Sequence, residues 1–575
     1  MTENEQPEIE ETHAPETHLS VAKKNSFKER MGRFFGSKKG KVVSVLVALV
    51  VIAGVIYAIP ASRYAIAGSF IKRNVHIAVT DSTTQKPVSD AELVLGSFTA
   101  KTDANGVVDI SNVPAGEYTL RVTKAYYTDM NQAYEVPVFG EAKEVKASLV
   151  ATGRQVVVSV TNKITKAALM GATVSVGGIT SVTNDKGIAT MVLPADKDTF
   201  DGKVMRDGYN EATVKVKASD QSDANVFTAT PSGSLFYLSK KSGKIDVMKS
   251  NLDGSGATVI VKGTGNESDN DTRLFPSSDW RYLMLSARRD TSFKGQLYLV
   301  DTKTNSLTLV DKGSDSSFSP VGWSDHTFVY SIYRNSKRNW ESGRYAIKSY
   351  DINTSKIVSI AESQGSGTQV KYEYERLDGP IIVDGKLAYS ISWERGEAMY
   401  SKTTKKNAVV TVNIDGTNKV KIKEFSMNYY GNVQLRYMSP VKFSIQASSD
   451  NKANQYFQYD SGNVSTLNTT DETYWDTSYP LRRTSPDGEK TLWYEARDGK
   501  NSIFLGNSAG AAGKEIATES DYTVFGWYSD DYILLTKNSS ELYIAAVNKA
   551  EDGMTTPVKV ANYHKAAGYW GYGGQ

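Results

Sequence analysis

The chain has 575 residues, more than one ordinary domain needs, and its 67 Lys and Arg nearly balance its 64 Asp and Glu. A formal net charge of +3 argues against a nucleic-acid-binding protein, and the lack of cysteine excludes disulfides, thiolate metal sites and cysteine nucleophiles. Five histidines leave little material for metal or acid–base chemistry, whereas the abundance of β-forming residues predicts a mainly β chain.

The N-terminal region contains one long apolar run. Residues 42–59 carry no charged side chain, and a helix of 18 residues spans roughly 27 Å at 1.5 Å per residue, about the thickness of a bilayer core. Lys and Arg are concentrated before this run, which predicts a cytoplasmic N-terminus. We therefore expect a single transmembrane signal-anchor helix at 41–60 in the plasma membrane, with the chain after about residue 60 extracytoplasmic. A cleaved signal peptide is the alternative interpretation.

Residues 1–40 precede this run. The first 20 carry six Glu and no Lys or Arg, and the following 20 are basic. This composition predicts a disordered cytoplasmic tail, acidic and then basic, which is short for a signalling output domain.

An internal repeat follows. Asp81, Ala91, Gly96 and Gly106 recur as Asn162, Ala172, Gly177 and Gly187, each 81 residues later. These turn residues separate alternating apolar stretches such as AELVLG and ATVSVG. The pattern predicts two similar β-sandwich domains, at 74–150 and 152–230.

The first repeat has a recognisable sequence. Its string VTDSTTQKPVSDAELVLGSFTAKTDANGVVDISNVPAGEYTLRV resembles the carboxypeptidase regulatory-like, or transthyretin-like, fold, and VPAGEYTLRV is also similar to PEGA-type surface domains. The second copy matches less well. The resemblance implies spacer or docking domains without chemistry of their own.

From residue 233 to the end, a four-strand pattern recurs. Its clearest unit, residues 484–518, resembles the TolB-like and WD-type propeller blade. Seven candidate second strands, among them TFVYSI at 327 and YILLT at 532, predict a β-propeller of about seven blades at 233–575, with six or eight as alternatives. The C-terminal GYWGYGG is similar to first strands such as PVGWSD, so we expect the last residues to complete blade 1 beside residues 233–262.

The propeller's long loops predict a binding face. In a propeller, the loops between second and third strands lie on the same face as the connections between blades, and here the long segments belong mostly to these two kinds. They are rich in Trp, Tyr and Arg, the residues that dominate binding interfaces. The candidate partner-binding residues are Arg334, Arg338, Trp340, Arg344, Tyr372, Tyr374, Trp393, Arg395, Tyr400, Tyr474, Trp475 and Tyr479.

One acidic loop is a weak metal candidate. Glu267, Asp269 and Asp271 could together bind Ca²⁺ through their oxygens, although a solvated acidic loop is the favoured interpretation. Nothing else in the sequence predicts a metal, a cofactor or a catalytic residue.

These observations predict a mainly β protein with one transmembrane helix, two β-sandwich domains and a C-terminal propeller. The expected function is a membrane-anchored cell-surface binding or adhesion protein, not an enzyme, whose propeller engages a protein or cell-wall glycan and no nucleic acid. A propeller hydrolase or lyase acting on a cell-surface substrate is one alternative. A transmembrane sensor or a scaffold of an envelope complex is the other.

Overall fold

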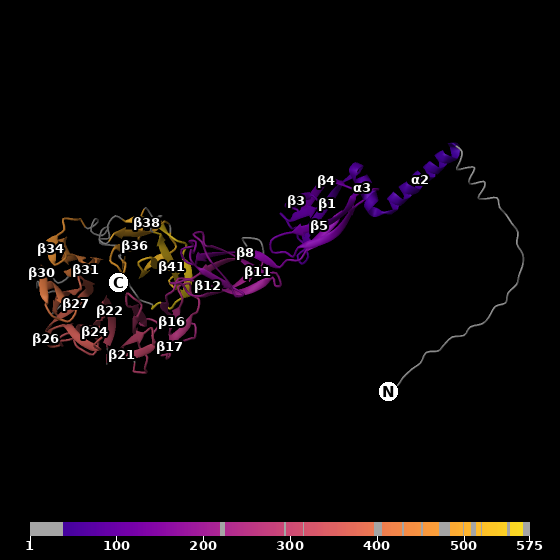
Figure 1. Cartoon of the computed structure of the whole chain (residues 1–575). Coiled ribbons are helices and arrows are strands. Elements are labelled where there is room, and N and C mark those ends of the chain that lie inside the picture. The colour runs from indigo at the N-terminus through magenta and orange to yellow at the C-terminus, as the bar shows by residue number, and fades with distance from the viewer. Residues whose placement is uncertain are drawn as a thin grey trace, which may run out of the picture. The chain divides into compact units, whose positions relative to one another are not determined.

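The computed structural model describes residues 38–566, apart from 219–224, 293–294, 314–315, 396–404, 428–430, 450–451, 471–482, 498–499, 508–512, 519 and 549–552 (Figure 1). The expected tail at 1–40 therefore lies almost entirely outside the described residues. The chain divides into two compact units, one ending at Arg154 with residues 194–196 added, the other containing the rest.

Two helices begin the described chain, α2 (Lys38–Ala58) and α3 (Pro60–Phe70). Ile59 caps α3 and Pro60 starts it, because proline is well suited to a first helical position, so the charge-free part of α2 runs only from Val42 to Ala58. Among the described residues, no helix is long and apolar enough to cross a membrane. This finding corrects the expected transmembrane helix at 41–60, and with it the fold class, the integral membrane association and the plasma-membrane localisation.

The first unit contains a two-layer β-sandwich. One sheet has the order β4-β1-β7, and the other has the order β3-β2-β5-β6. Buried and exposed side chains alternate along the strands, as in β7, and the buried ones form one apolar core between the layers. The strands are β1 (Lys72–Asp81), β2 (Glu92–Leu95), β3 (Phe98–Lys101), β4 (Val107–Pro114), β5 (Gly116–Thr123), β6 (Met130–Val136) and β7 (Val145–Leu149).

The second sandwich repeats this topology strand by strand. Its sheets have the orders β11-β8-β14 and β10-β9-β12-β13, so each strand is the counterpart of the one seven places earlier. The internal sequence repeat is thus a repeat of fold. The strands are β8 (Gly153–Asn162), β9 (Thr173–Val176), β10 (Ile179–Val182), β11 (Ile188–Pro194), β12 (Thr199–Met205), β13 (Ala212–Lys217) and β14 (Val226–Ala229).

The repeated turn residues make equivalent hydrogen bonds in both copies. Asp81 and Asn162 each accept backbone N–H bonds from the residues two and three positions later. Asp103 and Asn184 each accept them from the residues two and four positions later. Such side-chain acceptors fix a turn, and an amide oxygen can replace a carboxylate oxygen in this role.

Seven antiparallel sheets follow in the part of the chain that the structure describes, arranged round a ring (Figure 1). The first four blades are built from β15 (Leu235–Ser239), β16 (Asp246–Ser250) and β17 (Thr258–Val261); β18 (Arg273–Pro276), β19 (Tyr282–Ala287), β20 (Gln296–Asp301) and β21 (Ser306–Lys312); β22 (Ser316–Ser324), β23 (Thr327–Arg334), β24 (Tyr345–Asp351) and β25 (Lys356–Glu362); and β26 (Gly365–Gly367), β27 (Tyr372–Val383), β28 (Lys386–Arg395), β29 (Lys405–Asn413) and β30 (Val420–Met427).

The last three blades complete the β-propeller. They comprise β31 (Asn432–Ser439), β32 (Lys442–Ser449), β33 (Lys452–Asp460) and β34 (Asn463–Thr466); β35 (Arg483–Thr484), β36 (Lys490–Arg497), β37 (Lys500–Asn507) and β38 (Lys514–Ala517); and β39 (Thr523–Ser529), β40 (Tyr532–Lys537), β41 (Glu541–Asn548), β42 (Gly553–Met554) and β43 (Val558–Asn562). Each segment expected as a second strand is a strand. Apolar clusters fill the spaces between neighbouring blades.

The chain returns to blade 1 after its last strand. The backbone N–H of His564, two residues beyond β43, donates to the carbonyl oxygen of Leu238 in β15 at 2.7 Å. Of the residues expected to complete blade 1, 566–575, all but Ala566 lie outside the described residues, so ring closure by them stays a prediction.

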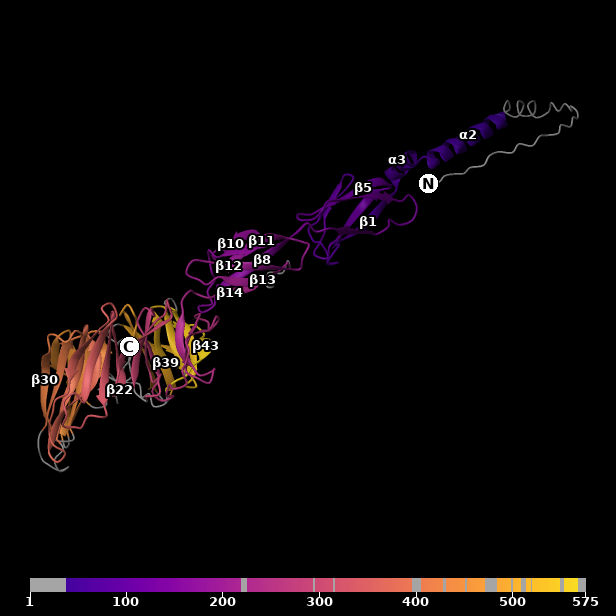
Figure 2. The ribbon, with the colours of Figure 1, turned by 90° about the horizontal axis from the view of Figure 1, so that it is seen from below.

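The second sandwich packs on the propeller within the same unit (Figure 2). Ile164, in the turn after β8, is fully buried in a cluster with Leu235, Leu252 and Leu534 of blades 1 and 7. Nearby, the Thr230 hydroxyl donates to the Asp253 carboxylate at 2.8 Å. Residues 252 and 253 belong to the turn between β16 and β17, the third and last strands of blade 1, so the sandwich docks on the face opposite the predicted binding loops.

Candidate binding site on the propeller

Two loops of blades 3 and 4 join into one surface. The first connects β23 to β24, and the second connects β25 to β27 through the short strand β26. The backbone N–H of Gly343 donates to the Ser363 oxygen at 2.6 Å, and the N–H of Gly365 donates to the Ser342 hydroxyl at 3.1 Å. A Cβ on Gly365 would lie 2.8 Å from the backbone carbon of Trp340, so the absence of a side chain permits this close approach.

Five half-buried aromatic side chains gather at this surface, and we call them the aromatic platform: Tyr333, Trp340, Tyr345, Tyr372 and Tyr374. The ring centroids of Trp340 and Tyr372 are 5.6 Å apart at an angle of 50°, and those of Tyr372 and Tyr374 are 6.0 Å apart at 37°. Tyr333 and Tyr345 are cross-strand partners with centroids 5.2 Å apart. These spacings lie in the range of favourable aromatic pairs, so the rings support one another.

Asn339 links the rings of Trp340, Tyr372 and Tyr374 to the pair of Tyr333 and Tyr345. Its amide nitrogen donates to the Tyr372 hydroxyl at 3.2 Å, and its amide oxygen accepts a hydrogen bond from Arg344. Arg344 also donates to the Tyr333 hydroxyl and lies over that ring, with the guanidinium carbon 5.0 Å from the centroid. A single polar chain therefore holds the loop between β23 and β24 in place.

Glu394 organises the inner edge of the site. Its carboxylate accepts a hydrogen bond from the Tyr374 hydroxyl at 2.6 Å and another from an Arg376 N–H at 3.2 Å, while Arg376 also donates to Asp378 at 3.0 Å. Burial raises the pKa of Tyr374, and its hydrogen bond to Glu394 raises it further. Burial alone would lower the pKa of Arg376, but the carboxylates of Asp378 and Glu394 outweigh it and raise that pKa. Tyr374 is therefore a neutral donor and Arg376 a cation over the physiological range.

The structure brings together four of the residues predicted for the binding face: Trp340, Arg344, Tyr372 and Tyr374. Arg334 borders them and pairs with Glu362 at 3.8 Å. Arg338 is exposed in the same loop.

Trp393 projects away from this group. It is the cross-strand partner of Glu375, whereas Tyr374 is the partner of Glu394, so Trp393 and Tyr374 lie on opposite faces of one sheet. Arg395 ends β28, and its side chain is outside the described structure. The remaining candidates lie outside the described residues: Tyr400, Tyr474, Trp475 and Tyr479.

Sequence reasoning missed several members of the site: Tyr333, Asn339, Tyr345, Arg376 and Glu394. Two signals could have found some of them. Tyr372, Tyr374 and Arg376 alternate along one strand and therefore share a face. Tyr333 and Tyr345 stand at the two ends of one loop, where antiparallel pairing places them side by side.

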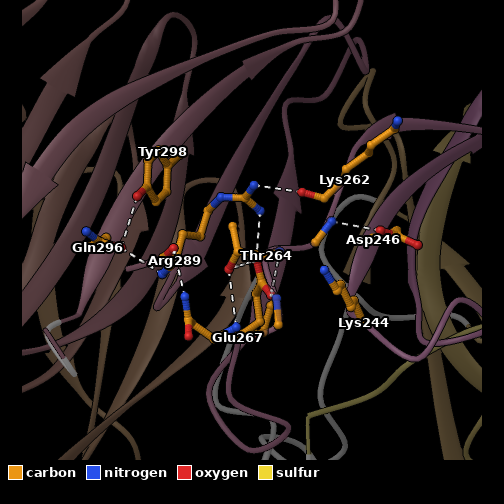
Figure 3. A network of polar contacts seen from close by, with 12 residues as sticks. Lys244, Asp246, Lys262, Thr264, Glu267, Arg289, Gln296 and Tyr298 are labelled. Atoms are coloured by element: carbon orange, nitrogen blue, oxygen red, sulfur yellow. Dashed lines mark hydrogen bonds and ion pairs between the residues drawn. The ribbon is translucent and has the colours of Figure 1, made fainter. Parts of the chain in front are cut away.

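Glu267, one of the weak metal candidates, is occupied by internal contacts (Figure 3). Its side chain is 1% exposed and pairs with Arg289 at 3.0 Å. It also accepts the backbone N–H groups of Thr264 and Gly265. Arg289 in turn donates to the Lys262 carbonyl oxygen at 2.7 Å. These bonds fix the connection between blades 1 and 2.

The other two carboxylates of that loop have their own cations. Asp269 pairs with Lys240 at 2.6 Å, and Asp271 pairs with Arg288 at 3.2 Å. Among the described residues, no group of three or more His, Cys, Asp or Glu is placed to hold a metal ion. The three acidic side chains therefore act as separate ion pairs in the structure.

Comparison with known protein families matches one domain. Residues 73–152 match the model of the SpaA prealbumin-like fold domain, which covers the first sandwich and supports the expected transthyretin-like fold. The finer assignments to carboxypeptidase regulatory-like or PEGA-type domains are not distinguished by this match. No curated protein matches the chain.

Solved structures of propeller proteins are similar to this chain in fold. An oligogalacturonate lyase from Vibrio parahaemolyticus is 14% identical over 55% of this chain and 87% of its own, with a TM-score of 0.35. TolB from Acinetobacter baumannii is 14% identical over 55% and 75%, with a TM-score of 0.27. The propeller domain of the Trilobed protease from Pyrococcus furiosus is 10% identical over 64% and 96%, with a TM-score of 0.33.

These comparisons correct the prediction that the protein is not an enzyme. Besides the lyase, the similar structures include a putative 6-phosphogluconolactonase and prolyl peptidases. A paucity of histidine does not by itself exclude catalysis on this fold.

Proposed function

We propose that this protein is a binding protein whose propeller engages a protein or glycan partner through the aromatic platform of blades 3 and 4. The observation that carries the proposal is the gathering of five aromatic rings with Arg344, Arg376 and Glu394 on one loop-rich face. Trp, Tyr and Arg supply most of the binding energy in known interfaces, and a rigid scaffold lowers the entropic cost of binding.

The position of the second sandwich supports this assignment. Ile164 and Thr230 dock on the face that carries the turns between third and fourth strands. The loops after β23 and β25 lie on the other face of the ring, because successive antiparallel strands end on alternate faces. The platform is therefore left free by the sandwich that belongs to the same unit.

The proposal is tested by affinity capture with the full chain and with two variants, Trp340→Ala and Tyr372→Ala. Each variant should weaken binding of the captured partner by about 1–2 kcal/mol, roughly five- to thirtyfold, because anchor residues of interfaces typically lose this much on truncation. Melting curves should change little, since neither half-buried side chain belongs to the apolar clusters between blades 3, 4 and 5.

Trp393→Ala is the matched control. It removes the same type of side chain as Trp340→Ala, and it lies in the same blade as Tyr372 but on the opposite face of the sheet, so partner affinity should stay at the wild-type level. Full-strength binding by both platform variants, with normal melting, would place the partner site elsewhere on the molecule.

A further inference from the structure

The first and last blades of the propeller meet at a seam, where the chain begins and ends its circuit of the ring (Figure 1). Blade 1 has three strands among the described residues, and β15 is the innermost of them. The backbone N–H of His564 reaches the carbonyl oxygen of Leu238, near the end of β15 that lies away from the second sandwich. A closed seam therefore needs a further contact at the other end of blade 1, on the face where the sandwich docks.

Three tryptophans of the described propeller join inner strands of different blades through the indole N–H. Trp323 of blade 3 donates to a carbonyl oxygen of β18 in blade 2 at 3.4 Å, and Trp527 of blade 7 donates to one of β35 in blade 6 at 2.9 Å. Trp280, in the turn after β18, donates to the carbonyl oxygen of Tyr528 in blade 7 at 3.0 Å. The first two bonds join a blade to the one before it, whereas Trp280 passes over blade 1 and joins blade 2 to blade 7.

The Trp280 ring packs against both blades that meet at the seam. Its centroid lies 5.3 Å from that of Tyr528 at an angle of 37°, and 6.4 Å from that of Phe236 in β15 at 22°. It also borders the apolar clusters on the two sides of blade 1. Such spacings are favourable for aromatic pairs, and the indole N–H has the partner that partial burial requires. We call Trp280 and Tyr528 the aromatic clasp.

The backbone of Trp280 shows that its side chain is placed there at a conformational cost. Its φ is +59°, in the left-handed region that bulky residues rarely adopt. The corresponding turns of blades 3 and 4 have Asp325 and Asp384 at positive φ, and aspartate tolerates this region. Blade 2 thus has tryptophan where two other blades have aspartate. The contacts of the indole across the seam offset the strain.

The clasp also contacts the segment that arrives from the second sandwich. The Tyr528 hydroxyl accepts the backbone N–H of Ser234 at 3.2 Å. A Cβ on Gly233 would overlap this hydroxyl, so the absence of a side chain permits the approach. Ile164 of the sandwich packs against leucines of both blade 1 and blade 7. The sandwich and the clasp therefore support the same seam.

We infer that Trp280 closes the propeller ring on the sandwich face, by joining blade 2 to blade 7 past the inner edge of β15. Closure at this end does not require residues 567–575, whose part in completing blade 1 is a separate prediction. The inference is also independent of the proposed function, because it concerns the opposite face of the ring. A closed seam keeps the edge of β15 from opening to solvent and to other chains.

Hydrogen exchange of the full chain, followed by mass spectrometry, tests this inference. Trp280→Asn keeps a residue suited to the left-handed turn but removes the clasp. Exchange in β15 and β39 should become about tenfold faster or more, because local opening is easier once an aromatic pair and a hydrogen bond are lost. Deleting residues 567–575 alone should speed exchange in these strands by less. The two changes together should exceed the product of their separate effects, because each alone leaves one closing contact in place.

Trp323→Asn is the matched control. It removes the corresponding indole bond between blades 2 and 3, so exchange should become faster in β18 and β22 and stay at the wild-type rate in β39. A second variant, Trp280→Phe, retains an aromatic ring but lacks the N–H. It should speed exchange in β15 and β39 by less than Trp280→Asn does, and it provides the test if the asparagine variant does not fold.

Three results would overturn the inference. The first is wild-type exchange in β15 and β39 in both Trp280 variants. The second is equally faster exchange in every blade, which would indicate general destabilisation instead of an opened seam. The third is a deletion of residues 567–575 that reproduces the full effect, with no further increase from Trp280→Asn, because the C-terminal residues would then close the ring.

Discussion

Replacing Ile164 with threonine should loosen the second sandwich from the propeller. Ile164 is 0% exposed, packed among leucines of blades 1 and 7, whereas the residue at the same position of the first repeat is the exposed Thr83. The change removes one methylene equivalent, about 0.8 kcal/mol, and buries a hydroxyl at a cost of about 1–3 kcal/mol. We therefore expect the unfolding free energy of the second unit to fall by about 2–4 kcal/mol.

Differential scanning calorimetry of the full chain measures this effect. In the wild type, the second sandwich and the propeller should melt in one transition, and in Ile164→Thr the sandwich should melt separately at lower temperature. Val182→Thr is the control, since Val182 is 60% exposed in the same sandwich and its replacement should cost less than about 0.5 kcal/mol. A variant that melts like the wild type would refute the view that this contact couples the two domains.

Three further predictions concern the first sandwich and the ring. Gly106→Ala should destabilise the first sandwich by about 1–3 kcal/mol more than Gly140→Ala. Both glycines have a positive φ, but only at Gly106 would the new Cβ lie 2.6 Å from a backbone oxygen. Equal shifts in the melting temperatures of the two variants would contradict this prediction. Burial raises the pKa of Asp81, yet its hydrogen bonds outweigh burial and lower that pKa, so its stabilisation is present above pH 3.8 and is lost as pH falls further. Asp81→Asn introduces the residue that the second repeat has at Asn162. The unfolding free energy of this variant, measured in acid unfolding curves, should lack the decrease that Asp81 causes as pH falls. Deleting residues 567–575 should lower the melting temperature of the propeller if they complete blade 1, and an unchanged transition would argue against closure.

Local patterns in the sequence were sufficient to place most strands. The apolar segment TFVYSI, one of seven that recur as second strands, predicted the strand that the structure shows as β23 (Thr327–Arg334), and the repeat spacing of 81 residues predicted two sandwiches with matching turns. These inferences succeed because hydrophobic alternation and turn chemistry act over a few residues. The apolar run at 42–59 was interpreted as one membrane-spanning helix, whereas in the structure α2 ends at Ala58 and Ile59 caps a second helix that starts at Pro60.

Contacts between residues that are far apart in the sequence could not be predicted from these local patterns. The sequence around Ile164 does not reveal that this one turn is covered by another domain, while its counterpart at Thr83 is exposed. The same limit applies to Trp393, whose direction depends on the pairing register of β27 and β28. Loop composition indicated a candidate binding face, and the strand register decided which of its aromatic residues lie together.

Site-specific photo-crosslinking tests the central claim most directly. A photoreactive amino acid placed at Arg338, an exposed residue of the loop between β23 and β24, should form a covalent adduct with the bound partner. The same probe at Lys303, an exposed residue in the turn between β20 and β21 on the opposite face, should form none. Adducts at Lys303 and not at Arg338 would show that the partner binds the other face, and would contradict the assignment of the aromatic platform as the binding site.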